Sequence, residues 1–122
     1  MIGGHIKNKY NAKRISLSGK KYDSLAESRR FSELSRQQRL GLITDLKRQV
    51  SFELIPAQYD ENGKLLERAV TYKADFTYRK DGKLIVEDVK SKATKTDSYI
   101  IKRKLMLYVH KVKLVEIEER KK

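Results

Sequence analysis

The sequence has no cysteine, a single proline and no long hydrophobic run. The absence of cysteine excludes a disulfide scaffold, a zinc–thiolate site and a thiol nucleophile. No apolar run approaches the roughly 20 residues that a membrane-spanning helix needs, and the first residues lack the apolar stretch of a secretory signal. We therefore expect a soluble intracellular protein with no membrane partner.

The length and the hydrophobic pattern are those of one folded domain. The chain has 122 residues, of which 39% are hydrophobic and fall in patterned segments, so wholesale disorder is not expected. Residues 1–22 have a basic character and no sustained periodicity, and we expect them to form a mostly irregular arm. Residues 23–122 are expected to form a single domain.

Positive charge dominates the composition. Lys and Arg total 29 and Asp and Glu total 16, which makes the formal net charge +13. Such an excess on a small domain indicates a polyanionic partner, and nucleic acid is favoured over an anionic membrane surface. A merely solubilising surface is the alternative. The expected nucleic-acid contacts are Lys13, Arg14, Lys20, Lys21, Lys92, Lys95, Lys102 and Lys104.

Two segments, 23–41 and 97–109, have the hydrophobic spacing of helices. The candidate N-caps are Asp23 or Ser24 for the first and Asp97 or Ser98 for the second. In the second helix Lys104 lies in the middle of the expected apolar face, where it can snorkel to solvent or supply charge to a site. The other members of that face are Ile100, Ile101, Leu105, Leu107 and Tyr108.

Alternating hydrophobicity predicts strands between and after the helices. The expected strands are 49–56, 68–78, 83–90 and 112–117, with turns at 60–63 and at Asp81-Gly82. One face of the second strand is expected to carry Val70, Tyr72, Ala74, Phe76 and Tyr78. The order of helix, three-stranded meander, helix and strand predicts a mixed α/β (α+β) layer fold. Its last strand joins the mixed sheet by a crossover.

Two acidic residues interrupt these patterns, and such breaks are where function is expected. Glu27 shares the apolar stripe of its helix with Phe31 and Leu34. The simplest alternative for Glu27 is to reach back to the helix cap. Asp75 lies inside a strongly β-forming run, where Asp is disfavoured, and its simplest alternative is a place on a solvent-facing side of the sheet.

An acid and a lysine also end the apolar face of strand 83–90. Asp88 and Lys90 follow Leu84 and Val86 at the period of two that puts side chains on one face. Their simplest alternative is a cross-strand ion pair. Glu87 points to the opposite face, so Glu87 and Asp88 do not form one site.

One arrangement accounts for these charged positions together. Asp75 and Asp88 on neighbouring strands can hold a hard divalent cation through oxygen ligands, with Glu27 approaching from the packed helix. Three close carboxylates repel one another without such a cation. Lys90 would project beside the metal. A metal, a lysine and a basic surface together suit the hydrolysis of a phosphodiester.

The same residues resemble a known superfamily signature. Asp75, followed thirteen residues later by Asp88-Val89-Lys90, resembles the D…(D/E)xK signature of the PD-(D/E)xK nucleases, with Ala74 in place of the usual proline. Glu27 resembles the Glu that members often carry on the preceding helix. The superfamily also has a Q-x-x-x-Y element on the following helix. Its spacing is found here in Lys104 and Tyr108, with Lys in place of Gln.

Residues 10–118 more closely resemble small phage-encoded endonuclease-like proteins. The matching stretches include Ala26-Glu27-Ser28-Arg29-Arg30-Phe31, Tyr72-Lys73-Ala74-Asp75-Phe76 and Val86-Glu87-Asp88-Val89-Lys90-Ser91. The resemblance implies a restriction-endonuclease-like core and an endodeoxyribonuclease that uses Mg²⁺, with Mn²⁺ as a substitute. Asp75, Asp88 and the Val89 carbonyl would bind the metal. Glu27 would contact it directly or through water, and Lys90 would be the catalytic lysine.

A chain this small has no room for a separate domain that reads DNA sequence. The resemblance therefore favours branched or nicked duplex DNA as substrate, cut in the manner of a Holliday-junction resolvase during phage recombination or replication. The place of action would be the cytoplasm of an infected or lysogenic bacterial cell. Cutting two strands with one site per chain calls for a homodimer. The alternatives are a non-catalytic nucleic-acid-binding module on the same fold and a protein-binding accessory factor.

Overall fold

The computed structural model describes residues 15–17, 20–22, 24–90 and 95–118. Lys13, Arg14 and Lys92, three of the expected nucleic-acid contacts, lie outside the described residues, as do the side chains of Lys20 and Lys21. The elements are β1 (Ile15–Leu17), β2 (Lys20–Tyr22), α2 (Leu25–Arg39), β3 (Thr44–Ile55), β4 (Gln58–Tyr59), β5 (Leu65–Glu67), β6 (Val70–Lys80), β7 (Lys83–Lys90), α3 (Asp97–His110) and β8 (Val115–Glu118).

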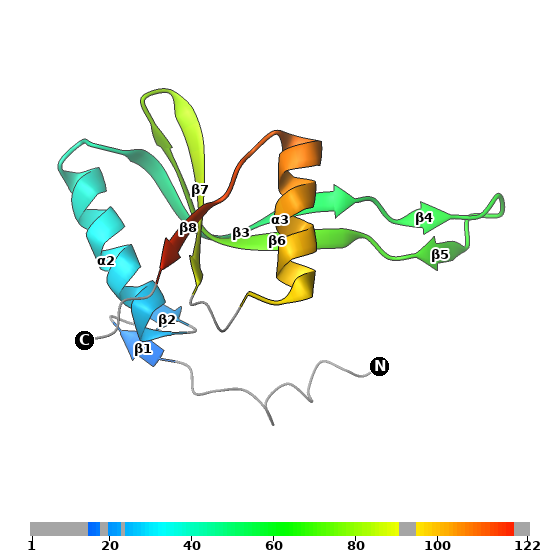
Figure 1. The fold of residues 1–122 in the computed structure, drawn as a ribbon, viewed down its shortest axis with the longest axis horizontal. Helices are drawn as coiled ribbons and strands as arrows, with labels where there is room; N and C mark the ends of the chain where they lie inside the picture. Colours follow the sequence, from blue (N-terminus) through cyan, green and yellow to red (C-terminus); the bar gives the residue numbers. More distant parts are fainter. Residues whose placement is uncertain (1–14, 18–19, 23, 91–94, 119–122) are drawn as a thin grey trace.

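The main sheet has four strands in the order β3-β6-β7-β8 (Figure 1). β3, β6 and β7 form an antiparallel meander, while β8 pairs parallel to β7 after the α3 crossover. This mixed α/β architecture, with its last strand added by a crossover, is the fold class that the sequence predicts. No helix among the described residues is long and apolar enough to cross a membrane.

Two hydrophobic cores form, one with each helix. Leu34 of α2 packs with Phe76 and Tyr78, whereas Met106 of α3 packs with Tyr72 and Ala74. The expected single face of β6 is therefore wrong, because its alternate residues divide between the two cores. Gln49, which lies opposite Asp75 in the β3–β6 register, has a φ of 54° and interrupts the extended backbone at this point.

The helices begin close to the predicted positions. Ser24 caps α2, because its side chain accepts a hydrogen bond from the Glu27 N–H at 3.0 Å. The cap of α3 is Thr96, one residue before the nearer predicted candidate, Asp97, and its side chain accepts from the Tyr99 N–H at 3.1 Å. Thr96 leaves Asp97 in the first turn, where its charge favours the helix dipole.

The apolar face predicted for α3 is confirmed in part, because Ile100 and Leu105 pack against the core that contains Met106. Tyr99 and Met106, two turns apart, are the residues of α3 that are buried, while Tyr108 is 76% exposed. Ile101 and Leu107 are also exposed, as is Lys104. The helix is turned so that the Tyr99 ring enters the core and its hydroxyl reaches Glu116 of β8 at 2.6 Å. The spacing of apolar residues along α3 does not by itself distinguish the observed orientation of the helix from the predicted one.

The sequence predicts the three hairpins with different success. Asp81 and Gly82 join β6 to β7 with φ values of 52° and 79°, the left-handed pair that an Asp-Gly turn supplies. The turn at 60–63 is present, but β4 and β5 flank it and form an arm that extends away from the body in Figure 1. β1 and β2 pair within the segment expected to be mostly irregular. β3 starts at Thr44, five residues before the predicted strand.

Candidate active site

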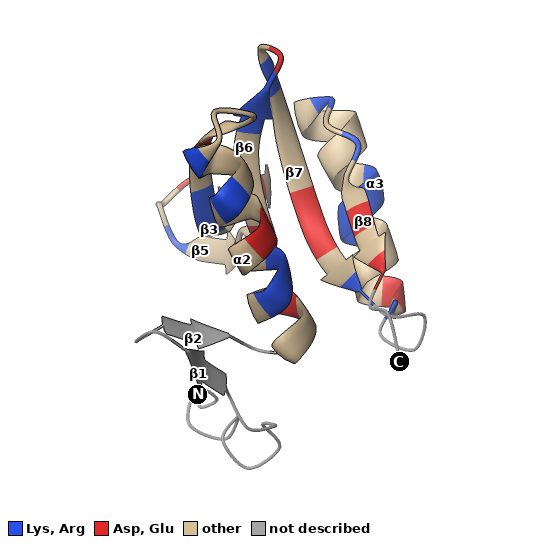
Figure 2. Ribbon diagram, turned by 90° about the vertical axis from the view of Figure 1, so that its left-hand side faces the viewer, with Lys and Arg blue, Asp and Glu red and all other residues tan. Residues whose placement is uncertain are grey.

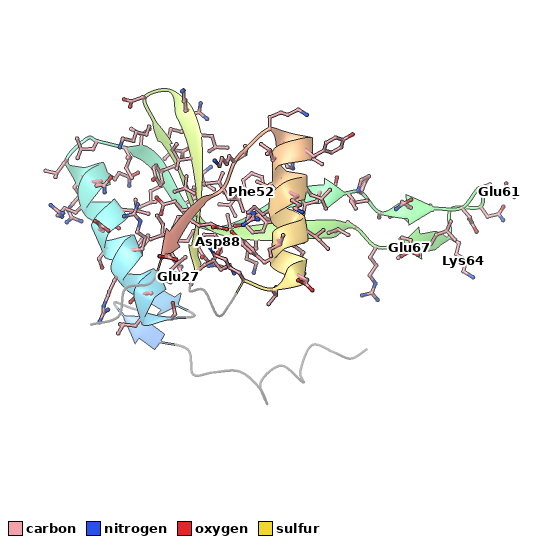
Figure 3. All side chains as sticks on the ribbon, viewed as in Figure 1. Glu27, Phe52, Glu61, Lys64, Glu67 and Asp88 are labelled. Carbon is pink, nitrogen blue, oxygen red and sulfur yellow. The ribbon has the colours of Figure 1, made fainter. Side chains whose placement is uncertain are left out.

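Three carboxylates from different elements converge beside the middle of the sheet. Glu27 comes from α2, Asp75 from β6 and Asp88 from β7, and both Glu27 and Asp88 are only 4% exposed. In Figure 3 Glu27 points from its helix toward the part of β7 that carries Asp88. The Asp75 side chain accepts a hydrogen bond from the Val89 N–H at 2.7 Å, which ties it to the same strand. The structure thus brings together the acidic residues that the sequence singles out.

The charges of the other two carboxylates affect the pKa of Asp75. Burial raises its pKa, as do the negative charges of Asp88 and Glu27, and together they bring it to about 7 against the opposing hydrogen bond from the Val89 N–H. The cause of the perturbation is therefore a desolvated group of like charges. An acidic group of this kind is stabilised by any cation that its oxygens can reach.

Lys90 lies at the same place and not in bulk solvent. Its Nζ is 3.4 Å from Asp88 Oδ1, and its side chain is 22% exposed. The ammonium also lies 4.5 Å from the centre of the Tyr99 ring, a favourable cation–π distance. Lys90 is consequently held by two partners while keeping part of its surface open to a ligand.

Glu27 does not use its side chain to cap its own helix. Its backbone N–H donates to Ser24, but its carboxylate accepts from Gln49 Nε2 of β3 at 2.8 Å. The capping interpretation of the carboxylate is therefore wrong. Gln49 orients Glu27 toward the sheet, and it is one of two residues in β3 with a positive φ.

Sequence reasoning missed the residues that support this cluster. Tyr72, expected only as core, donates its hydroxyl hydrogen bond to Asp88 Oδ2. Glu116 lies opposite Asp88 in the β7–β8 register and accepts from Tyr99. The one available signal for Tyr72 was its position three residues before Asp75 on a strand that also carries the acidic site.

The expected nucleic-acid contacts of α3 and the loop before it differ in their ion pairs and in their exposure. Lys95 is engaged by Glu116, with Nζ 3.1 Å from Oε1, and Arg103 binds the other oxygen of Glu116 at 3.0 Å. Lys102 is half-buried. Lys104 and Tyr108 lie exposed on α3, so the structure does not bring this pair into the acidic cluster. A role for Lys104 in a site between helix and sheet stays a prediction.

Glu116 provides a test of this network through the pH dependence of stability. The Tyr99 hydrogen bond, together with Lys95 and Arg103, lowers the pKa of Glu116 from 4.5 to about 2. The ionised carboxylate therefore stabilises the fold fully above pH 4.5, and this contribution is lost as the pH falls toward 2. We expect Glu116→Gln to remove that part of the acid-induced fall in the urea midpoint. Glu118→Gln, on the same strand, is the control and should follow the wild-type curve.

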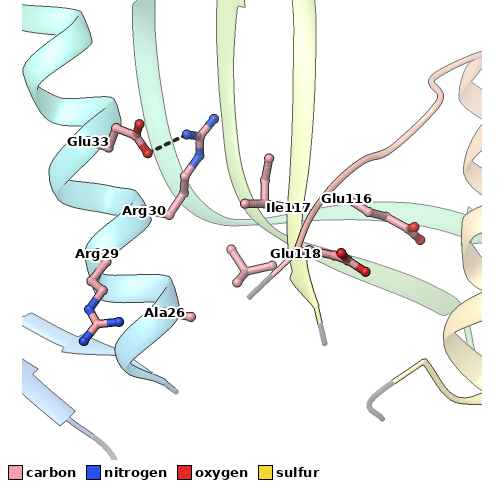
Figure 4. Close-up of a pocket in the computed structure, with 8 residues that line it drawn as sticks. Ala26, Arg29, Arg30, Glu33, Glu116, Ile117 and Glu118 are labelled. Carbon is pink, nitrogen blue, oxygen red and sulfur yellow. Dashed lines mark hydrogen bonds and ion pairs between the residues drawn. The ribbon is translucent and has the colours of Figure 1, made fainter. Parts of the chain in front are cut away.

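An open hollow of about 670 Å³ borders the cluster at Val89 (Figure 4). Arg30 lines it from α2 and is bonded to Glu33 at 2.7 Å. The remaining lining residues are Ala26, Arg29, Glu116, Ile117 and Glu118. The hollow therefore lies between the helix that carries Glu27 and the end of the sheet that carries Asp88.

The donor set of the cluster fits a hard divalent cation. Carboxylate oxygens from three elements are the ligand chemistry that Mg²⁺ prefers. In their present arrangement no group of three or more His, Asp or Glu side chains among the described residues has metal-holding geometry. The Asp88 oxygens are instead engaged by Tyr72 and Lys90.

Comparison with known proteins gives a family and no function. Residues 7–121 match the model of a family described as protein of unknown function, DUF1064. No curated protein and no solved structure matches the chain. The match extends across nearly the whole chain, including every residue of the acidic cluster.

Proposed function

The chain belongs to the DUF1064 family, and we propose that it is a metal-dependent DNA endonuclease that hydrolyses phosphodiester bonds. The observation that carries this proposal is the convergence of Glu27, Asp75 and Asp88 with Lys90. These residues come from one helix and two strands, and a desolvated group of like charges of this kind is typical of a functional site. The order of elements is compatible with a restriction-endonuclease-like core, which we include in the proposal.

Glu27, Asp75, Asp88 and the Val89 carbonyl would hold Mg²⁺, or Mn²⁺ in its place. When bound, the ion supplies Lewis acidity to the scissile phosphate and lowers the pKa of its water. Lys90 donates hydrogen bonds through its ammonium, which orients the attacking water or offsets charge that develops on the phosphate. Tyr72 holds the Asp88 carboxylate in place, and Gln49 does the same for Glu27.

The substrate we propose is branched or nicked duplex DNA, in phage recombination or replication. The described residues form one four-stranded sheet with two helices and two small hairpins, so recognition of DNA shape is more accessible to this fold than recognition of a long sequence. Resolution of a junction in the manner of Holliday-junction resolvases requires two cuts, for which we propose a homodimer.

Cleavage of synthetic junctions, nicked duplexes and linear duplexes tests the function. We expect cuts in the presence of Mg²⁺ or Mn²⁺, none with EDTA, and faster cutting of branched than of linear DNA. Asp88→Asn should abolish cleavage because it removes one of the three carboxylate charges, while preserving the shape of the side chain. Thermal unfolding of this variant checks that it folds. No cleavage by the wild type with either metal, or undiminished cleavage by Asp88→Asn, would refute the proposal.

A non-catalytic nucleic-acid-binding module is the second candidate. It is favoured by the engagement of the Asp88 oxygens by Tyr72 and Lys90, which satisfies them with protein groups alone. This alternative predicts salt-sensitive DNA binding that is unchanged by EDTA, with no strand cuts on any substrate. The cleavage assay therefore separates the two candidates directly.

A further inference from the structure

The end of the sheet remote from the acidic cluster carries a second concentration of positive charge. Its members come from the C-terminal half of α2, the start of β3 and the β6–β7 turn, and all are exposed. We define this distal basic end as Arg36, Arg39, Lys47, Arg79, Lys80 and Lys83. None of these residues is among the nucleic-acid contacts expected from the sequence.

Backbone pairing holds these residues at one end of the molecule. Thr44, at the start of β3, pairs with Arg79, and Lys80 pairs directly with Lys83. The end of α2 is attached to the same place, because the Leu46 N–H donates to Gln38 Oε1 at 2.9 Å. Figure 2 views this side and shows basic segments on α2, on β3 and beside the β6–β7 turn.

The charge of the distal basic end is poorly balanced by the protein itself. Lys47 has a partner in Asp45, but at 3.9 Å and with both side chains exposed. Arg36, Arg39, Lys80 and Lys83 form no ion pair with any described residue. Lys80 and Lys83 are cross-strand neighbours of like charge, an arrangement that destabilises a hairpin unless an anion offsets it.

We infer that the distal basic end is a second DNA contact surface, which binds the phosphate backbone of a duplex whose scissile phosphate lies at the acidic cluster. The identity of the polyanion rests on the proposed function, whereas the presence of the surface does not. A flat anionic membrane is a poorer fit, because Asp81 lies in the two-residue turn beyond the Lys80–Lys83 pair and would meet it first. A duplex can instead lie along the side of the turn.

The distance along β7 between the distal basic end and the acidic cluster is short compared with a DNA duplex. Lys83 precedes Asp88 by five residues on this strand, which corresponds to about 17 Å at about 3.3 Å per residue, and the odd separation places the two side chains on opposite faces of the strand. Successive phosphates along one DNA strand advance by about 3.4 Å, so the distal contacts would fall about five base pairs from the cleaved bond.

DNA binding at varied salt tests the inference without any need for cleavage. The probe is a duplex of about 20 base pairs, two helical turns, with EDTA present and with salt between about 50 and 200 mM. The variant Lys80→Gln/Lys83→Gln removes two of the proposed phosphate contacts. We expect the slope of log affinity against log salt to become shallower by about 2. The matched control is Lys64→Gln/Arg68→Gln, which removes the same charge at the exposed β4–β5 arm.

The outcomes are distinct from those of the cleavage assay. A shallower slope for the β6–β7 variant alone supports the surface, even if the wild type proves unable to cut DNA. Equal slopes for the two variants would overturn it. Unchanged DNA binding combined with lost binding to phosphatidylserine vesicles would also overturn it, because the partner would then be a lipid surface.

Discussion

Replacing Lys90 with alanine is expected to lower the rate of DNA cleavage by about 10²–10³-fold, the usual effect of removing one preorganised donor from a phosphoryl or acyl transfer site. The reason is its position: the ammonium lies 3.4 Å from Asp88 and beside the Tyr99 ring, at the mouth of the acidic cluster. Single-turnover cleavage at saturating enzyme measures this effect on the chemical step, free of changes in product release.

Two comparisons show whether the loss belongs to catalysis. Lys90→Arg keeps the charge but not the compact ammonium, so we expect intermediate activity. Lys113→Ala removes an exposed lysine near β8 and should cut at the wild-type rate. DNA affinity in EDTA should fall little in Lys90→Ala, because one phosphate contact is a small part of the basic surface. Full activity of Lys90→Ala would show that Lys90 is merely the ion-pair partner of Asp88.

The sheet meander was predictable because its signals are local. The Asp81-Gly82 turn requires two left-handed residues, and its observed φ values of 52° and 79° satisfy that requirement. The alternation on either side then determines β7, whose observed bounds, Lys83–Lys90, are the predicted ones. The separation of Glu87 from Asp88 also follows from the period of two, and Glu87 indeed faces Arg30 of α2.

The parts that failed depend on contacts between distant segments. The division of β6 between two cores falls at Asp75, opposite Gln49 of β3, whose positive φ is not indicated by the residue types of that stretch. The orientation of α3 depends on the hydrogen bond that the Tyr99 hydroxyl donates to Glu116, a residue of the following strand. Periodicity describes one element at a time, so it does not contain either fact.

The acidic positions of the candidate site were predictable, but their support was not. Glu27, Asp75 and Asp88 stand out because each violates the pattern of its own element. Tyr72 and Gln49 do not break the pattern of their strands, because a tyrosine in a core strand and a glutamine in a half-buried strand are both ordinary. Their hydrogen bonds to Asp88 and Glu27 become visible only once the strands are placed side by side.

A second large effect is expected at the ion pair that joins α2 to β7. Arg30 donates from Nε to Glu87 Oε1 at 2.8 Å and from Nη2 to Oε2 at 2.6 Å, and Tyr78 donates to Oε2 as well. The side chain of Glu87 is 1% exposed and that of Arg30 is 17% exposed. The hydrogen bonds with Glu87 raise the pKa of Arg30, so the guanidinium keeps its charge at neutral pH.

We expect Arg30→Ala to lower the free energy of unfolding by about 3–5 kcal/mol, because it leaves the Glu87 charge buried with only Tyr78 as partner. The matched control is Glu33→Ala. Glu33 is the other partner of Arg30, and its side chain is 51% exposed. Its removal should lower the free energy of unfolding by at most about 1 kcal/mol. The variant Arg30→Met/Glu87→Leu should be more stable than Arg30→Ala, because no unpaired charge remains. Urea denaturation measures all three, and equal losses for Arg30→Ala and Glu33→Ala would contradict the prediction.

Since Arg30 lies one turn from Glu27, loss of this pair frees α2 from β7 where the helix presents its carboxylate to the site. We therefore expect variants that keep the pair charged and bonded to be the ones that keep Glu27 beside Asp75.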